Sequence, residues 1–161
     1  MTYEKDKTCC FTGHRNIPSY LNDRTRVAVS KEVEELIGLG YDTFVSGGAL
    51  GFDLIAAEAV IDLKARYPWI KLIFAIPCYG HDQRWSIDER LRLSVLYRHS
   101  DDAIFVSTDY DKGCMLKRNR YMVDNSSVLI SYCTRNTGGS AYTVRYAQKN
   151  GLKVIEISDK I

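Results

Sequence analysis

Two glycine-rich segments have the composition of anion-binding loops. One is Ser46–Asp53, which reads SGGALGFD, and the other is the pair Gly138-Gly139. Glycine loses more backbone freedom on folding than any other residue, so a glycine cluster indicates that something must approach the bare backbone. Where such a segment opens a helix, free N–H groups and the helix dipole favour an anion. We expect these loops to hold a phosphate against Gly47, Gly48, Gly51, Gly138 and Gly139.

Charged side chains accompany both segments. Arg15 follows Gly13 and His14, and a guanidinium can hold a phosphate through two parallel hydrogen bonds. Asp53 ends the first glycine segment, and its carboxylate can accept from a ribose hydroxyl. Arg118 and Asn119 could reach the same site from a later segment. The plainer alternative is that the glycines form tight turns, that Arg15 lies in a solvated turn, and that Arg118 and Asn119 lie on the exposed face of a helix.

Aromatic and amide side chains near a third apolar run could border a nucleobase. Tyr79, Gln83 and Trp85 follow Ile70–Ile76. An aromatic ring can stack on a base, and an amide can read its edge. Ordinary helix packing is an equally good explanation for Trp85.

Several common motifs are absent from the sequence. Neither glycine segment matches GxxxxGK[ST] or GxGxxG, which disfavours a P-loop NTPase and a conventional NAD dehydrogenase. The histidines are His14, His81 and His99, and no carboxylates cluster with them. We therefore expect no metal site.

The elements that must position these residues alternate between short apolar runs and amphipathic segments. The predicted strands are Thr8–Thr12, Thr43–Ser46, Ile70–Ile76, Ala103–Val106, Val128–Tyr132 and Leu152–Ile157. The predicted helices run from Asp23 to a stop at Gly40, and over Leu54–Arg66, Trp85–His99, Met115–Asp124 and Ser140–Lys149, the last ending at Asn150-Gly151. Ile87, Leu91 and Val95, spaced four apart, indicate the third of these helices.

This alternation predicts an α/β fold, a Rossmann-like three-layer sandwich with a mostly parallel central sheet. Ligands of such sheets bind at the carboxyl ends of the strands. The polar and glycine-rich segments follow those ends, so they should meet at one edge of the sheet.

Composition narrows the possible partners and setting. The 161 residues suit one domain spanning 1–161, and 22 basic against 20 acidic residues give a net charge of +2. No apolar stretch approaches the roughly 20 residues of a membrane span. Five scattered cysteines do not suggest a disulfide framework, and the polar start MTYEKDK lacks the apolar core of a secretion signal. We expect a cytoplasmic protein with no membrane partner.

From FTGHR at Phe11–Arg15 to GLKVIEI near its end, the chain resembles the YpsA-like branch of the SLOG superfamily. Relatives of this branch include the DNA-processing protein DprA and the LOG phosphoribohydrolases. SGGALGFD is the most specific part of the resemblance. The family implies a Rossmann-like fold that binds a nucleotide-derived ligand such as ADP-ribose, NAD or a nucleoside monophosphate, and relatives that self-associate imply a homodimer.

The sequence departs from the LOG hydrolases at one catalytic position. Those enzymes carry an arginine in a segment like MHxRK and a glutamate after PGGxGT. Here MLKRN keeps Arg118, but Val144 and Arg145 in TGGSAYTVRYA stand where the glutamate would be. LOG-type hydrolysis is therefore not expected, and whether any reaction is catalysed stays open. Asp53 is the candidate acid or base if the protein is an enzyme.

The leading hypothesis is a nucleotide-binding or sensing domain. Its predicted ligand contacts are Gly13, Arg15, Ser46, Gly47, Gly48, Gly51, Asp53, Gln83, Trp85, Arg118, Asn119, Gly138 and Gly139. One alternative is a hydrolase of a nucleotide's glycosidic or phosphate bond. Another is a DprA-like module for single-stranded DNA, which the sequence disfavours because it shows no basic stripe with interleaved aromatics.

Overall fold

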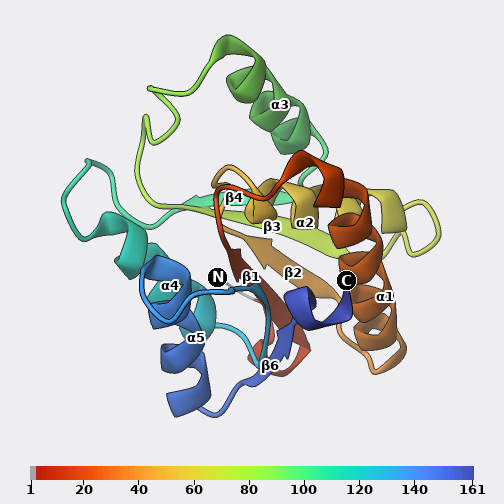
Figure 1. The fold of residues 1–161 in the computed structure, drawn as a ribbon. Helices are drawn as coiled ribbons and strands as arrows, with labels where there is room; N and C mark the ends of the chain where they lie inside the picture. The colour runs from red at the N-terminus through yellow and green to blue at the C-terminus, as the bar shows by residue number, and fades with distance from the viewer. Residues whose placement is uncertain (1–2) are drawn as a thin grey trace.

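Six parallel strands form one sheet in the computed structural model, which describes residues 3–161 (Figure 1). Met1 and Thr2 of the polar N-terminal stretch lie outside the described residues. The strands are β1 (Thr8–Gly13), β2 (Thr43–Ser46), β3 (Lys71–Ile76), β4 (Asp102–Phe105), β5 (Val128–Tyr132) and β6 (Lys153–Glu156). Every neighbouring pair is parallel. The predicted Rossmann-like α/β fold is confirmed, with a sheet that is wholly rather than mostly parallel.

The helices connect these strands and cover both faces of the sheet. They are α1 (Asn22–Gly38), α2 (Phe52–Leu63), α3 (Ile87–Arg98), α4 (Cys114–Asp124) and α5 (Gly139–Lys149), with short 3₁₀ turns η1 (Lys5–Lys7), η2 (Ser19–Leu21) and η3 (Ile157–Lys160). Residues of α1, α2 and α3 belong to one buried apolar cluster, and residues of α4 and α5 belong to another. The sheet is therefore the middle of three layers.

Alternation along the strands divides the core between these two clusters. On neighbouring residues of β2, Phe44 joins the cluster with α1 and α2, and Val45 joins the cluster with α4 and α5. Phe74 and Ile73 divide in the same way on β3. A strand covered on both faces must be apolar on both, which is why the sequence shows unbroken apolar runs here.

The strand order sets where a ligand can enter. The order is β4-β3-β2-β1-β5-β6, so the chain builds outward from β1 in one direction and then returns to add β5 and β6 on the other side. The order reverses between β1 and β5. In open α/β sheets the crevice at this switch point, beyond the carboxyl ends of the strands, is the usual ligand site.

Local sequence signals account for several helix ends. Gly40 and Gly151 have φ of 98° and 80°, and each follows the end of a helix, as predicted. The helix predicted from Trp85 begins instead at Ile87. Ser86 caps it, because its hydroxyl accepts from the Glu89 N–H while the Glu89 carboxylate accepts from the Ser86 N–H. Trp85 therefore belongs to the preceding loop.

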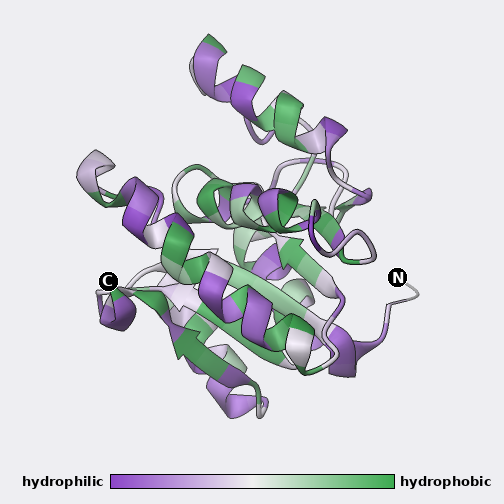
Figure 2. Cartoon of the chain, turned by 90° about the vertical axis from the view of Figure 1, so that its right-hand side faces the viewer, coloured by the Kyte–Doolittle hydropathy of each residue, from purple (hydrophilic) through white to green (hydrophobic). Residues whose placement is uncertain are grey.

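Helix α3 packs with an unexpected face inward. The spacing of Ile87, Leu91 and Val95 gives the helix correctly, but these side chains are exposed, whereas Leu93 and Leu96 are buried. Both views show α3 projecting from the rest of the fold (Figures 1 and 2), and Figure 2 shows hydrophobic residues alternating with hydrophilic ones along it. Among the helices of residues 3–161, none is long and apolar enough to cross a membrane.

Candidate functional site

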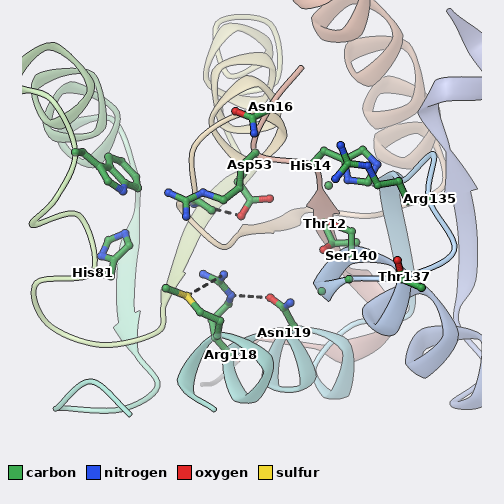
Figure 3. A pocket seen from close by; sticks show the side chains of 17 residues that line it. Thr12, His14, Asn16, Asp53, His81, Arg118, Asn119, Arg135, Thr137 and Ser140 are labelled. Carbon is green, nitrogen blue, oxygen red and sulfur yellow. Dashed lines mark hydrogen bonds between the residues drawn. The ribbon is translucent and has the colours of Figure 1, made fainter. Parts of the chain in front are cut away.

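A cavity of about 370 Å³ opens at the switch point, beyond the carboxyl ends of β1 and β5 (Figure 3). This volume lies in the range of small-molecule sites. The lining residues come from the end of β1 and the segment after it, from the segments after β2, β3 and β5, and from helices α2, α4 and α5. They are Thr12, Gly13, His14, Arg15, Asn16, Ala49, Asp53, His81, Trp85, Met115, Arg118, Asn119, Arg135, Thr137, Gly138, Gly139 and Ser140.

The N-terminus of α5 forms one wall of the cavity. Gly138, with φ of 99°, is its N-cap and provides no side-chain cap. A Cβ added at Gly138 or Gly139 would meet nothing within 4 Å, so this backbone is open to the cavity. The Tyr142 N–H donates to the Gly138 carbonyl, which leaves the preceding N–H groups without an acceptor inside the helix. This wall therefore has the features of an anion site.

His14 joins the two strands on either side of the switch point. Its Nε2 accepts from the Thr134 N–H at 2.8 Å, so the ring carries its proton on Nδ1. Burial lowers the pKa of His14, as does the neighbouring Arg135, while Glu156 opposes the shift. The neutral ring thus fixes the end of β1 beside the loop that leads to α5.

Asp53 lies in the first turn of α2 with 5% of its surface exposed. Its Oδ2 accepts from the Ala49 N–H at 3.2 Å. Burial raises the pKa of Asp53 to about 6, although Arg118, the Ala49 N–H and Arg15 oppose the rise. A carboxyl group that titrates near neutrality can accept from a hydroxyl when charged and donate when neutral.

Arg118 reaches from α4 toward Asp53 beneath the loop after β2 (Figure 3). Its Nη1 donates to the carbonyls of Gly47 and of Ala75, the latter at 3.3 Å, and its Nε donates to Asn119 Oδ1 at 2.8 Å. Burial lowers the pKa of Arg118, and the Asp53 charge opposes this. Much of this guanidinium's donor capacity is therefore used to fasten the loop to α4.

The glycines after β2 make room for the protein's own groups. A Cβ at Gly47 would lie 2.7 Å from Arg118 Nη1 and from Asp53 Oδ2. A Cβ at Gly51 would lie 2.3 Å from the Arg15 carbonyl oxygen. Neither glycine lines the cavity. The close approach that the sequence indicated is real, but its occupants are internal.

Two other predicted contacts, Ser46 at the end of β2 and Gly48 in the loop after it, are also buried. The Ser46 hydroxyl donates to the Asp53 carbonyl at 2.9 Å and accepts from the Gly48 N–H at 3.2 Å. Gly48 has φ of 68°, and its added Cβ would meet Ile76 and Phe74. Ser46 and Gly48 therefore shape the loop without facing the cavity.

The aromatic end of the cavity lies across from α5. Trp85 and His81 line it with their rings edge to face, 5.4 Å between centroids. Nε2 of His81 lies 3.3 Å from the Gly48 carbonyl, and burial lowers the pKa of His81. Gln83 is exposed in the turn with Gly80 and lies outside the cavity lining.

The structure thus brings most of the predicted ligand contacts together. Those in the lining are Gly13, Arg15, Asp53, Trp85, Arg118, Asn119, Gly138 and Gly139, whereas Ser46, Gly47, Gly48, Gly51 and Gln83 lie outside it. The predicted contacts did not include Thr12, His14, Asn16, Ala49, His81, Met115, Arg135, Thr137 and Ser140. Arg135 and Thr137 lie in the segment between β5 and α5, where the strand-end rule places a ligand site, although they were not among the predicted contacts. His81 sits in a turn that carries no such signal.

Within residues 3–161, no group of three or more histidine, cysteine, aspartate and glutamate side chains is placed to hold a metal ion.

These features define a Rossmann-like protein with a ligand-sized cavity at the switch point of its sheet. The YpsA family model, described as the YspA SLOG family, matches residues 9–157. The chain therefore belongs to this family, which confirms the resemblance seen in its motifs.

Two relatives come from Bacillus subtilis (strain 168). The uncharacterized SPbeta prophage-derived protein YoqJ is 31% identical over 121 residues, covering 68% of this chain and 71% of YoqJ. The UPF0398 protein YpsA is 25% identical over 125 residues, covering 76% of this chain and 69% of its own length. Neither of these two names states an activity.

Two solved structures share the fold. DNA processing protein A from Helicobacter pylori, described with a single-stranded DNA binding mode, has a TM-score of 0.65 and 21% identity over 97% of this chain and 71% of that chain. DprA from Streptococcus pneumoniae has a TM-score of 0.64 and 18% identity over 93% of this chain and 50% of that chain. At these identities the likeness supports the fold alone.

Proposed function

We propose that this protein binds a nucleotide derivative with a phosphate group, of the ADP-ribose or NAD kind, in the cavity at the switch point. The observation that carries the proposal is the open N-terminus of α5. Its bare backbone at Gly138 and Gly139 faces the same cavity as three arginines, Arg15, Arg118 and Arg135. Asp53 is the one carboxylate among the described residues of the lining. Such a cavity favours an anion.

The arrangement of the walls suggests how the ligand lies. A phosphate at the start of α5 would be neutralised by Arg15 and Arg135, which are exposed, rather than by Arg118, whose donors already hold backbone carbonyls. Asp53, which lies between His81 and Arg135 in Figure 3, suits a ribose hydroxyl. Trp85 packs against His81, which lies on the side of the cavity away from Arg135 and Thr137, and its ring suits a nucleobase.

A substitution at Gly139 tests whether the N-terminus of α5 binds the phosphate. Its position has open space and no positive φ, so Gly139→Leu should fold normally while its side chain occupies the anion site. We expect calorimetric titration with ADP-ribose to show affinity reduced by about tenfold or more, equivalent to about 1.4 kcal/mol.

Gly38→Leu is the matched control. Gly38 also has open space around its Cβ position and no positive φ, but it ends α1 and does not line the cavity. It should bind ADP-ribose like the unaltered protein. Equal affinities for all three proteins would contradict the proposal.

Hydrolysis of a nucleotide is a second candidate function, favoured by Asp53 alone. A carboxyl with a pKa of about 6 inside a ligand cavity is suited to general acid or base catalysis near neutral pH. Incubation with AMP, NAD and ADP-ribose, followed by assay for free base or ribose phosphate, tests it. Turnover that Asp53→Asn abolishes would support hydrolysis, and unchanged nucleotides would exclude it for these three compounds.

The DNA-binding alternative receives less support. Single-stranded DNA binding is described for the Helicobacter pylori neighbour, whose 21% identity to this chain supports only a shared fold. The net charge of +2 supplies little general attraction for a polyanion.

A further inference from the structure

Helix α3 is apolar on two opposite faces. Its inner face packs through Leu93 and Leu96, which are buried. Its outer face carries Ile87, Leu91 and Val95, exposed by 76%, 56% and 44%. A surface helix normally has one apolar face, and a second one usually marks a contact with another molecule.

A groove lies beside this outer face. It has a volume of about 420 Å³, and Ile87, Leu91 and Tyr97 give it a largely apolar lining together with Asp82, Arg90 and Ser94. The outer face therefore has both a ridge of projecting side chains and a groove. Helices pack against each other by placing the ridges of one in the grooves of the other.

Opposite charges stand at the two ends of the same face. Asp88 lies three residues before Leu91, and Arg98 lies three residues after Val95, which places both beside the apolar stripe. Both are exposed, and neither has an ion-pair partner within the described residues. Arg92, on a different side of the helix, is instead paired with Glu58 of α2.

We propose that the outer face of α3 binds a second copy of this chain, with the two α3 helices antiparallel about a two-fold axis. When the axis is level with Leu93, Leu91 of each copy lies opposite Val95 of the other. The same axis places Asp88 of each copy opposite Arg98 of the other. One symmetry operation thus pairs Leu91 with Val95 and Asp88 with Arg98, as an isologous interface requires.

The charge pattern favours a second copy over other occupants. An acidic end and a basic end on one face are matched by the same face reversed. An anionic membrane would attract Arg98 but repel Asp88. A partner with charge of one sign would match only one end. The interface needs no ligand, so this inference stands independently of the proposed function.

Sedimentation velocity from low to high micromolar concentration tests the apolar part. We expect the unaltered protein to be a dimer and Leu91→Lys to be a monomer with an unchanged circular dichroism spectrum. Val27→Lys is the matched control, because Val27 is a 58% exposed apolar residue on α1, and this variant should remain dimeric. A monomer for the unaltered protein at all concentrations would overturn the proposal.

A charge exchange tests the antiparallel register. Asp88→Arg alone and Arg98→Asp alone place like charges opposite each other, so each should weaken dimerisation. The double variant restores opposite charges and should recover the dimer. A dimer that neither Leu91→Lys nor the single charge variants weaken, or a double variant that stays monomeric, would contradict this arrangement.

Discussion

At Arg118, a buried guanidinium donates to the carbonyls of Gly47 and Ala75 and balances the charge of Asp53. Arg118→Met would leave these acceptors without their donor and the carboxyl without its nearby cation. We expect the free energy of unfolding to fall by about 3 kcal/mol. Urea denaturation followed by circular dichroism measures this.

Arg135→Met is the matched control for Arg118→Met. Arg135 lines the same cavity but is exposed, so its loss should change the free energy of unfolding by about 0.5 kcal/mol or less. Equal losses for the two variants would show that Arg118 does not hold the loop as described.

Asp53 gives the protein a pH-dependent stability of definite sign. Its pKa is raised from 3.8 to about 6 by burial, so between about pH 4 and 6 the folded state keeps a proton that the unfolded chain releases. The contribution of Asp53 to stability therefore falls as pH rises through this window, by about 3 kcal/mol. Asp53→Asn removes this dependence.

Urea denaturation at about pH 4 and about pH 7 measures the effect. The free energy of unfolding of Asp53→Asn minus that of the unaltered protein should be larger at the higher pH than at the lower pH. A constant difference between the two proteins would contradict the shifted pKa.

The residues of the loop after β2 show how far sequence reasoning reaches at this scale. The composition of Ser46–Asp53 correctly indicated that something lies close against the backbone. At Gly47 that group is the guanidinium of Arg118, which lies 71 residues further along the chain. No local pattern shows which distant side chain will fill the space, and a bound phosphate was the natural but different expectation.

Helix α3 depends on its cap for its start. The reciprocal hydrogen bonds of Ser86 and Glu89 satisfy N–H groups that otherwise have no partner. Ser86→Ala should lower the free energy of unfolding by about 1 kcal/mol. Urea denaturation measures the loss, and Ser94→Ala, on the exposed middle of the same helix, should cost less. A Ser86→Ala variant as stable as Ser94→Ala would contradict this role for the cap.

Strands and helices were predictable because local signals define them. Apolar runs gave the strands within a few residues, and Gly40 and Gly151 gave two helix ends. The inward face of α3 was not predictable in the same way. Leu93 and Leu96 compete with Ile87, Leu91 and Val95 for the core, and only the packing of the whole fold decides between them.

At the scale of the whole molecule, the strand order explains why the cavity could be located from the sequence. Alternating elements imply a parallel sheet, and parallel strands bring their carboxyl ends to one edge. Arg15 and Gly138 therefore line the same cavity although they are 123 positions apart in the sequence. The strand order itself was not predicted. Only the structure therefore shows that the helix N-terminus open to the cavity is that of α5 and not that of α2.

The most direct test of the central claim is an amide NMR titration of isotope-labelled protein with ADP-ribose. We expect the largest shifts at the start of α5, at Gly138, Gly139, Ser140 and Ala141, with smaller ones at Gly47 and Gly51 in the loop after β2. Shifts concentrated in that loop, or no shifts with saturating ADP-ribose, would contradict the claim.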